Sequence, residues 1–222
     1  MRMDNKNKTR NIFFIVSLFL SIGLNGQTSE DAKKLLDDVS SNLISFENLS
    51  FDFSYILENR PENIRQETNG SATISDNLYK IIFLGNEQIF DGEKIYTVVP
   101  ENEEIMISSP EDSSDFGLLN PSELFVFYKM GYAYQWDIKQ SVKGVPIQYI
   151  KLIPSEENLD IKYLLIGIDL RSKLIYKLIE IGKSDTITTL TLKNIRTNLN
   201  LSQDFFSLDT DKYPDYFINN KN

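Results

Sequence analysis

The chain has 222 residues, of which 41% are apolar and 25% charged, and its formal net charge is −9. This is the composition of an ordinary globular domain, and the acidity argues against partners that are themselves anionic, nucleic acids above all. The chain has no histidine, so serine–histidine catalysis and zinc, copper or non-haem iron sites are not expected. We expect no cofactor and no metal, although carboxylate-only chemistry and calcium binding stay open.

Residues 1–26 have the pattern of a signal peptide. A basic stretch with Lys6, Lys8 and Arg10 precedes an uncharged run, Ile12–Leu24, which is the right length for a signal-peptide core but short for a membrane span. We expect cleavage near Gly26 and export to the periplasm, with an uncleaved anchor as the alternative. Cleavage removes four basic residues and one acid, which takes the net charge from −9 to −12. The chain has no cysteine to carry a lipid anchor, and residues 27–222 are expected to form one soluble domain.

The first predicted element is an amphipathic helix over Thr28–Phe46. Thr28 or Ser29 can cap its start, and two acidic residues follow in the first turn. Five apolar residues recur at helical spacing and form one stripe: Ala32, Leu35, Leu36, Val39 and Leu43. We expect a helix packed on the rest of the domain, with a partner-binding helix as the less favoured alternative.

After this helix the apolar pattern changes to a period of two. In LSFDFSYIL (49–57) alternate residues are apolar, which indicates a strand with one buried face. Similar runs, separated by short polar turns, predict an antiparallel meander of roughly ten to eleven strands. The runs are 49–57, 67–75, 77–85, 87–90, 94–99, 104–108, 132–140, 145–154, 161–169, 173–181 and 185–198. A further strand piece is expected in the tail.

A short helix is predicted between the two series of strands. Asn120 can cap it and Pro121 occupies its first position, with Glu123 completing a capping box. Large apolar residues then fill residues 124–130 with one interruption, Lys129. A helix that is apolar all round is buried on both sides, so it is either a core helix or a lid over a cavity.

Two sets of acidic residues are candidates for a catalytic or calcium-binding role. Asp91-Gly92 lies between two strand-like runs, which is a strong hairpin signal, and no catalytic partner lies near it. Asp91 is therefore interpreted as the corner of a turn. Asp209, Asp211 and Asp215 lack the glycine and glutamate of a calcium-binding loop and are interpreted as solvated acids.

Several segments, in this order, resemble the LolA family of periplasmic lipoprotein carriers. The likeness covers nearly all of residues 28–212. It rests on the strand–Asp-Gly–strand–Pro pattern around Asp91 and on the mid-chain helix 121–130. The segments that carry it are FENLSFDFSY, NGSATIS, LYKIIFLGNEQIFDGEKIYTVVPENEEIMI, AYQWDI, YIKLIP and NLNLSQDFFSL.

The resemblance implies an α+β fold, an incomplete, half-open antiparallel β-barrel closed by helices that act as a lid. It implies a non-enzymatic carrier that binds the acyl chains of lipidated proteins as a monomer. Cargo would come from an inner-membrane ABC transporter and pass to an outer-membrane acceptor. One family feature, a basic residue that latches the lid, has no counterpart near Ser75-Asp76. A lipid-sensing module of the same fold and a secreted carboxylate-dependent enzyme are the alternatives.

The physical case for a carrier does not need the family name. Burying one CH₂ gains about 0.8 kcal/mol, so a chain of about 16 carbons costs on the order of 12 kcal/mol to expose to water. The expected lining of the cavity and lid is Phe51, Phe53, Ile81, Phe83, Tyr96, Met106, Leu124, Phe125, Tyr128 and Trp136. Within the lid, Phe125 and Tyr128 are expected to touch cargo, and Phe127 and Met130 to pack on the sheet.

Overall fold

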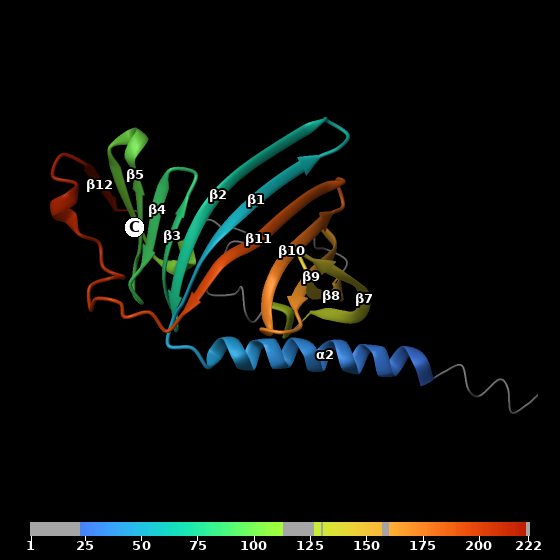
Figure 1. Ribbon diagram of the computed structural model, residues 1–222. Coiled ribbons are helices and arrows are strands. Elements are labelled where there is room, and N and C mark those ends of the chain that lie inside the picture. Colours follow the sequence, from blue (N-terminus) through green and yellow to red (C-terminus); the bar gives the residue numbers. More distant parts are fainter. Residues whose placement is uncertain (1–22, 113–126, 130, 157–159, 221–222) are drawn as a thin grey trace, which may run out of the picture.

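The computed structural model describes residues 23–112, 127–129, 131–156 and 160–220. In this part of the chain one α-helix, α2 (Gly23–Ile44), lies across a single curved sheet of twelve strands (Figure 1). The strands are β1 (Leu49–Asn59), β2 (Ile64–Ser75), β3 (Leu78–Phe83), β4 (Asn86–Phe90), β5 (Ile95–Val99), β6 (Glu104–Ser108), β7 (Tyr132–Val142), β8 (Val145–Pro154), β9 (Ile161–Asp169), β10 (Leu174–Gly182), β11 (Thr186–Thr197) and β12 (Phe217–Asn220).

The sheet consists of two antiparallel meanders joined side by side. Its strand order is β12-β6-β5-β4-β3-β2-β1-β11-β10-β9-β8-β7, so β1 pairs with β11 and the outermost strands are β12 and β7. The two outermost strands do not pair, and the sheet is an open half-barrel (Figure 1). The eleven runs of the sequence pattern correspond in order to β1–β11.

The strand piece expected in the tail is β12, which brings the sheet to twelve strands against the expected ten to eleven. The correction to the antiparallel meander is its pairing: β12 pairs with β6 in parallel, with Ile218 opposite Ile105. A four-residue strand, FINN, has too little alternation for its partner to be predicted from the pattern. It forms because the C-terminal segment brings it back to the free edge of β6.

Helix α2 begins before the residues that were predicted to cap it. Thr28 and Ser29 lie inside the helix, so neither is its N-cap, because in this chain the preceding residues continue the helical turn. The predicted apolar stripe is confirmed, since Ala32, Leu35, Leu36, Val39 and Leu43 are all buried. Asn42 Nδ2 donates to the carbonyls of Ser172 (3.0 Å) and Lys173 (3.3 Å), which ties the helix to the β9–β10 turn. In the described part of the chain, no helix combines the length and the apolarity that crossing a membrane requires.

The C-terminal segment covers part of the outer face of β3–β6. Tyr213 donates from its hydroxyl to Glu87 Oε2 (3.0 Å), and the Lys80 ammonium, which pairs with Glu87 (2.9 Å), lies 5.3 Å from the centre of the Phe205 ring. Burial and the Glu87 carboxylate raise the pKa of the Tyr213 hydroxyl to about 12. Ile89, Val98 and Ile105 are almost fully buried on this side. The sheet therefore has apolar residues on both faces in this region.

Gly70 allows two aromatic rings to meet across β2. Phe53, Gly70 and Phe83 lie opposite one another on β1, β2 and β3, and the Phe53 and Phe83 rings are 5.6 Å apart. A Cβ on Gly70 would overlap Phe53 Cζ and would lie 2.6 Å from the Ile82 carbonyl oxygen. Only glycine fits here, because the ring of Phe53 occupies the space of a side chain.

We predict that Gly70→Ala destabilises the protein by about 1–3 kcal/mol through overpacking. Adding Phe53→Leu removes the contact with the ring but not the contact with the Ile82 carbonyl. The double variant should therefore lose less stability than the sum of the losses in the two single variants. Urea unfolding of the two single variants and the double variant measures this coupling. Strict additivity of the two changes would contradict the packing described for Gly70.

Candidate functional site

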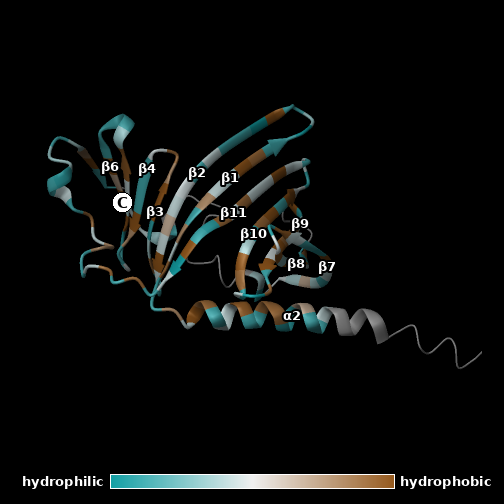
Figure 2. Cartoon of the chain, viewed as in Figure 1, coloured by the Kyte–Doolittle hydropathy of each residue, from teal (hydrophilic) through white to brown (hydrophobic). Residues whose placement is uncertain are grey.

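The concave face of the half-barrel is the candidate site. Residues directly opposite in antiparallel strands project from the same face, so the register traces this face across the sheet. Apolar and polar residues alternate along the strands, and α2 shows an apolar stripe (Figure 2). Five residues of α2 and the inner residues of β1–β3 and β8–β11 form one apolar cluster. The helix therefore covers part of the concave face.

The concave side of β1 is buried next to α2 and only partly buried toward the hairpin tip. Leu49, Phe51 and Phe53 are 5%, 3% and 1% exposed, whereas Tyr55 and Leu57 on the same face are only partly buried. In Figure 1 the helix lies at the base of the sheet, and the β1–β2 hairpin extends away from it. The concave face is consequently closed at one end by α2 and less covered toward the hairpin.

The concave face carries a row of aromatic rings where it begins to open. The ring of Phe53 is 6.3 Å from that of Phe51 and 5.6 Å from that of Phe83, and Tyr55 meets Phe83 edge-on at 5.3 Å. Tilted and edge-on pairs at these separations are favourable arrangements of aromatic rings. Such a row is apolar, and its outer members, Tyr55 and Phe83, are only partly buried. Toward β5 the face becomes polar, through the hydrogen bonds Tyr79–Gln88 (3.1 Å) and Gln88–Thr97 (3.2 Å).

Most of the predicted lining residues within the described strands lie on this face. Ile81 lies opposite Ala72, which lies opposite Phe51, so it shares their face. Met106 lies opposite Thr97 in the same row, and Trp136 lies opposite the buried Ile150 while remaining 40% exposed. With Phe51, Phe53 and Phe83, six of the ten predicted residues are on the concave face.

Tyr96 is a correction, because it lies on the outer face. The residues that continue the line of Phe51 across the sheet are Ala72, Ile81, Gln88 and Thr97. Tyr96 is the neighbour of Thr97 in β5 and lies opposite Ile89 and Ile107, so it projects from the other face. The alternation of a five-residue strand cannot by itself say which set faces inward when both faces are buried. Leu124 and Phe125, also predicted, lie outside the described residues.

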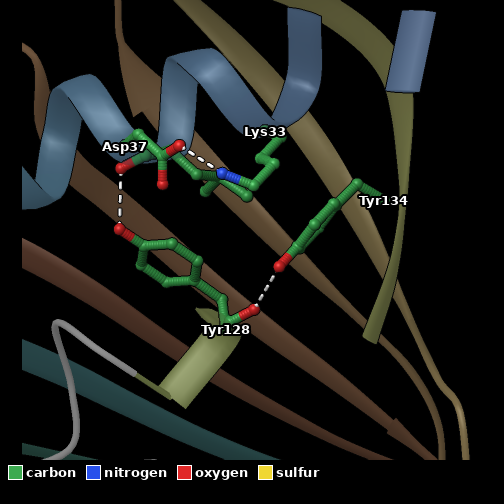
Figure 3. Close-up of polar contacts among 5 residues, drawn as sticks. Lys33, Asp37, Tyr128 and Tyr134 are labelled. Carbon is green, nitrogen blue, oxygen red and sulfur yellow. Dashed lines mark hydrogen bonds and ion pairs between the residues drawn. The ribbon is translucent and has the colours of Figure 1, made fainter. Parts of the chain in front are cut away.

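Tyr128 is held by α2, which corrects the expectation that it meets cargo. Its hydroxyl donates to the Leu36 carbonyl (2.7 Å), and the hydroxyl of Tyr134 donates to the Tyr128 carbonyl (2.7 Å; Figure 3). Its side chain is only 2% exposed, and burial raises the pKa of its hydroxyl. Of the helix predicted over 121–130, the structure describes η4 (Phe127–Lys129), a single 3₁₀ turn.

A pocket of about 310 Å³ opens where α2 ends and the chain enters β1. Its apolar lining comes from both elements and from β2: Leu43, Ile44, Phe46, Leu49 and Ile74. Glu47, Asn48 and Asp76 supply polar groups. Beside it the Ser75 hydroxyl donates to the Glu47 carbonyl (2.9 Å), so a neutral contact links β2 to this loop where a basic latch was considered. The volume is at the lower end for a ligand pocket.

Three residues of the open end are not among the ten predicted lining residues: Tyr55, Leu57 and Glu180. Tyr55 and Leu57 follow from the alternation of β1, which also identified Phe51 and Phe53. Glu180 lies opposite Leu164 and Thr188, so a carboxylate reaches the concave face. Burial, followed by the charge of Glu180, raises the pKa of the Tyr132 hydroxyl. No sequence signal marks Glu180, because a glutamate on a partly buried strand is usually assigned to the solvent side.

Asp91 forms the corner of the β4–β5 turn, as interpreted. Its Oδ1 accepts hydrogen bonds from the amides of Glu93 (2.9 Å) and Lys94 (2.8 Å), and Gly92 has a φ of +101°. Burial would raise the pKa of this carboxyl, but hydrogen bonds from those amides and from the Tyr96 hydroxyl outweigh it, and the pKa is lowered. Within the described residues no cluster of three or more histidine, cysteine, aspartate or glutamate side chains is placed to hold a metal ion.

The comparisons with known proteins identify the fold. An uncharacterized conserved protein from Thermus thermophilus is 11% identical with a TM-score of 0.58, and the match covers 86% of this chain and 99% of that one. LprF from Mycobacterium bovis is 11% identical with a TM-score of 0.48, and the match covers 79% of this chain and 96% of LprF. The LolA superfamily protein NE2245 from Nitrosomonas europaea is 10% identical with a TM-score of 0.43, covering 80% and 98%.

A comparison with family models gives no match, and neither does one with curated protein sequences. At these identities the structural likeness concerns the fold. The chain shares its fold, an open half-barrel, with the Thermus thermophilus protein.

We predict that Tyr128→Phe lowers the free energy of unfolding by about 0.5–1.5 kcal/mol, because the buried Leu36 carbonyl loses the hydroxyl donor. The matched control is Tyr55→Phe, which alters a hydroxyl on the partly buried part of the concave face. Chemical denaturation of both variants checks the difference. Equal, negligible changes would show that the Tyr128 hydroxyl does not stabilise the contact with α2.

We predict a pH-dependent contribution from Asp91. Its pKa is lower in the folded than in the unfolded protein, so its carboxylate stabilises the fold above the ordinary pKa of about 3.9. That contribution is lost as the pH falls through the lowered folded value. The stability difference between the wild type and Asp91→Asn should therefore be larger at neutral pH than in acid, measured by urea unfolding across pH. A constant difference at all pH values would contradict the assigned hydrogen bonds.

Proposed function

We propose that the protein is a non-enzymatic periplasmic carrier that binds the acyl chains of lipidated proteins and moves them toward the outer membrane. The observation that carries this proposal is the concave face, which is apolar, lined by the Phe51–Phe53–Phe83–Tyr55 row and less covered toward the hairpin end. A hydrocarbon chain laid on this row would remove apolar area from water on both partners, at roughly 25 cal/mol per Å².

The chemistry of the site favours binding over catalysis. Asp91 is occupied by hydrogen bonds in the β4–β5 turn, and the residues of the row itself are aromatic. Recognition of a hydrocarbon chain needs area and shape rather than reactive groups. In this role the carrier would receive cargo from an inner-membrane ABC transporter and deliver it to an outer-membrane acceptor, and it would act as a monomer after cleavage near Gly26.

The neighbouring residues Phe83 and Ile82 give a matched test, because they project from opposite faces of β3. We predict that Phe83→Ser weakens binding of a fluorescent 16-carbon fatty acid on the order of tenfold, since the row loses an exposed aromatic surface. Ile82, which is 49% exposed on the outer face, should tolerate Ser without loss of affinity. Titrations use folded protein, checked by circular dichroism.

Equal affinity of the two variants, or no binding by the wild type, would remove the concave face as an acyl site. Mass spectrometry of the protein purified from the periplasm tests the cargo. Co-purified lipoproteins support the carrier, and the same spectra report whether the mature chain begins near Gln27. A protein that binds the fatty acid but releases no lipoprotein from inner-membrane vesicles would favour the lipid-sensing alternative.

A further inference from the structure

The charge of the protein is divided unevenly between the two halves of the sheet. Residues 131–198, which contain β7–β11, have ten lysines and arginines and seven acids. Residues 27–130, which contain β1–β6 and most of α2, have seven lysines and arginines and twenty acids. The acidity of the whole chain therefore comes from one half, and the second half has a positive balance. Repulsion from anionic surfaces applies to the first half only.

The outer face of β8–β10 combines tyrosines with lysines. Tyr149, Gly167 and Lys177 lie opposite one another on the three strands, and Lys151 lies opposite Leu165, which lies opposite Ile179. Tyr163, two positions before Leu165, shares this face, and a bulge places Tyr176 beside Lys177. We call these residues the tyrosine–lysine face: Tyr149, Lys151, Tyr163, Leu165, Tyr176, Lys177 and Ile179.

The two lysines lie over tyrosine rings rather than beside acids. The Lys151 ammonium is 4.1 Å from the centre of the Tyr163 ring, and the Lys177 ammonium is 5.5 Å from that of Tyr176. Neither forms an ion pair with another described residue. The one acid that β8–β10 place on this face is Asp169, at its far end, where it accepts the amide of Arg171 (2.8 Å). The charges of the lysines are thus available to a partner.

The face continues to the open end of the half-barrel. A hollow of about 630 Å³ there is lined by Arg60 and Pro61 of the β1–β2 hairpin together with Tyr163, Ile181, Asp185 and Ile187. Asp185 is paired with Lys162 (2.5 Å), and Arg60 has no ion pair among the described residues. A third cation therefore lies at the rim, beside Tyr163. The outer face of the other half of the sheet, at β3–β6, is partly covered by the C-terminal segment.

We propose that the tyrosine–lysine face docks the protein on an anionic lipid bilayer. Tyrosine is enriched both in protein–protein interfaces and at the headgroup level of membranes, but lysine is depleted in protein–protein interfaces and is attracted to anionic lipid. The lysine stems lie along apolar surface and present the ammonium groups to lipid phosphates. Because three cations are few, the docking is weak and salt-sensitive, as a protein that must leave the membrane again requires.

The docking face adjoins the open end of the half-barrel at one rim. Arg60 and Tyr163 belong to this rim, and the partly buried end of β1 leads from it into the aromatic row. A protein docked through this face would have the rim at the edge of its membrane contact and the concave face on the other side of the sheet. The docking goes beyond the proposed function and does not depend on it.

The test is flotation of the purified protein with vesicles of phosphatidylcholine containing about one-third phosphatidylglycerol, and with vesicles of phosphatidylcholine alone. We expect binding to the anionic vesicles at about 0.05 M salt and its loss at about 0.5 M. Lys151→Gln/Lys177→Gln should weaken binding on the order of tenfold. The control Lys34→Gln/Lys94→Gln removes the same charge from exposed sites in the acidic half and should bind like the wild type.

Absence of binding to the anionic vesicles, equal binding to the neutral ones, or equal loss in both double variants would overturn the proposal. Capture of an acidic protein through Lys151 and Lys177 without vesicle binding would assign the face to a protein partner and overturn it as well. Fatty-acid affinity is measured on the same variants. It should be unchanged in Lys151→Gln/Lys177→Gln, because these lysines lie on the opposite face of the sheet. If this double variant lost vesicle binding and fatty-acid binding together, the docking face and the acyl site would not be separate surfaces.

Discussion

The pairing of β1 with β11 is the constraint on which the rest of the molecule depends. It joins two meanders whose strands, β12 apart, are otherwise paired with sequence neighbours. It connects residues more than a hundred positions apart, from Leu49 opposite Thr197 to Asn59 opposite Thr186. The two strands follow one register except at a shift between Ser50 and Asp52, where Asn194 adopts a φ of +50° and donates to Asp52 (2.7 Å). Bulges of this kind increase the twist and bend of a strand. The curved sheet is the result.

Once the sheet is curved, its two faces become chemically different. The concave face collects Phe51, Phe53 and Phe83 because alternate residues of a strand share a face, and α2 then covers the end nearest Leu49. The hairpin end is too far from the helix to be covered in the same way. The concave face is therefore an apolar surface that is closed at one end and less covered at the other.

The outer face is divided by what covers it. Over β3–β6 the C-terminal segment packs through Tyr213, Phe205 and β12, and the residues beneath it are buried. Over β8–β10 the same face carries Lys151 and Lys177 above tyrosine rings. Acids that would neutralise these lysines are concentrated in the other half of the chain, where they keep the average charge negative. The negative net charge therefore coexists with a cationic surface on the second half of the sheet.

The sequence by itself determined the elements whose signal is local. The period of two predicted β1–β11, the spacing of Ala32, Leu35 and Val39 predicted the buried stripe of α2, and Asp91-Gly92 predicted its turn. Tertiary structure decided what depends on contacts distant in the sequence. It set the register that turns Tyr96 outward, the return of β12 to β6, and the contact of Tyr128 with Leu36. A strand pattern defines two faces but does not say which is concave. That choice is made only when β1 pairs with β11 and the sheet bends around the helix.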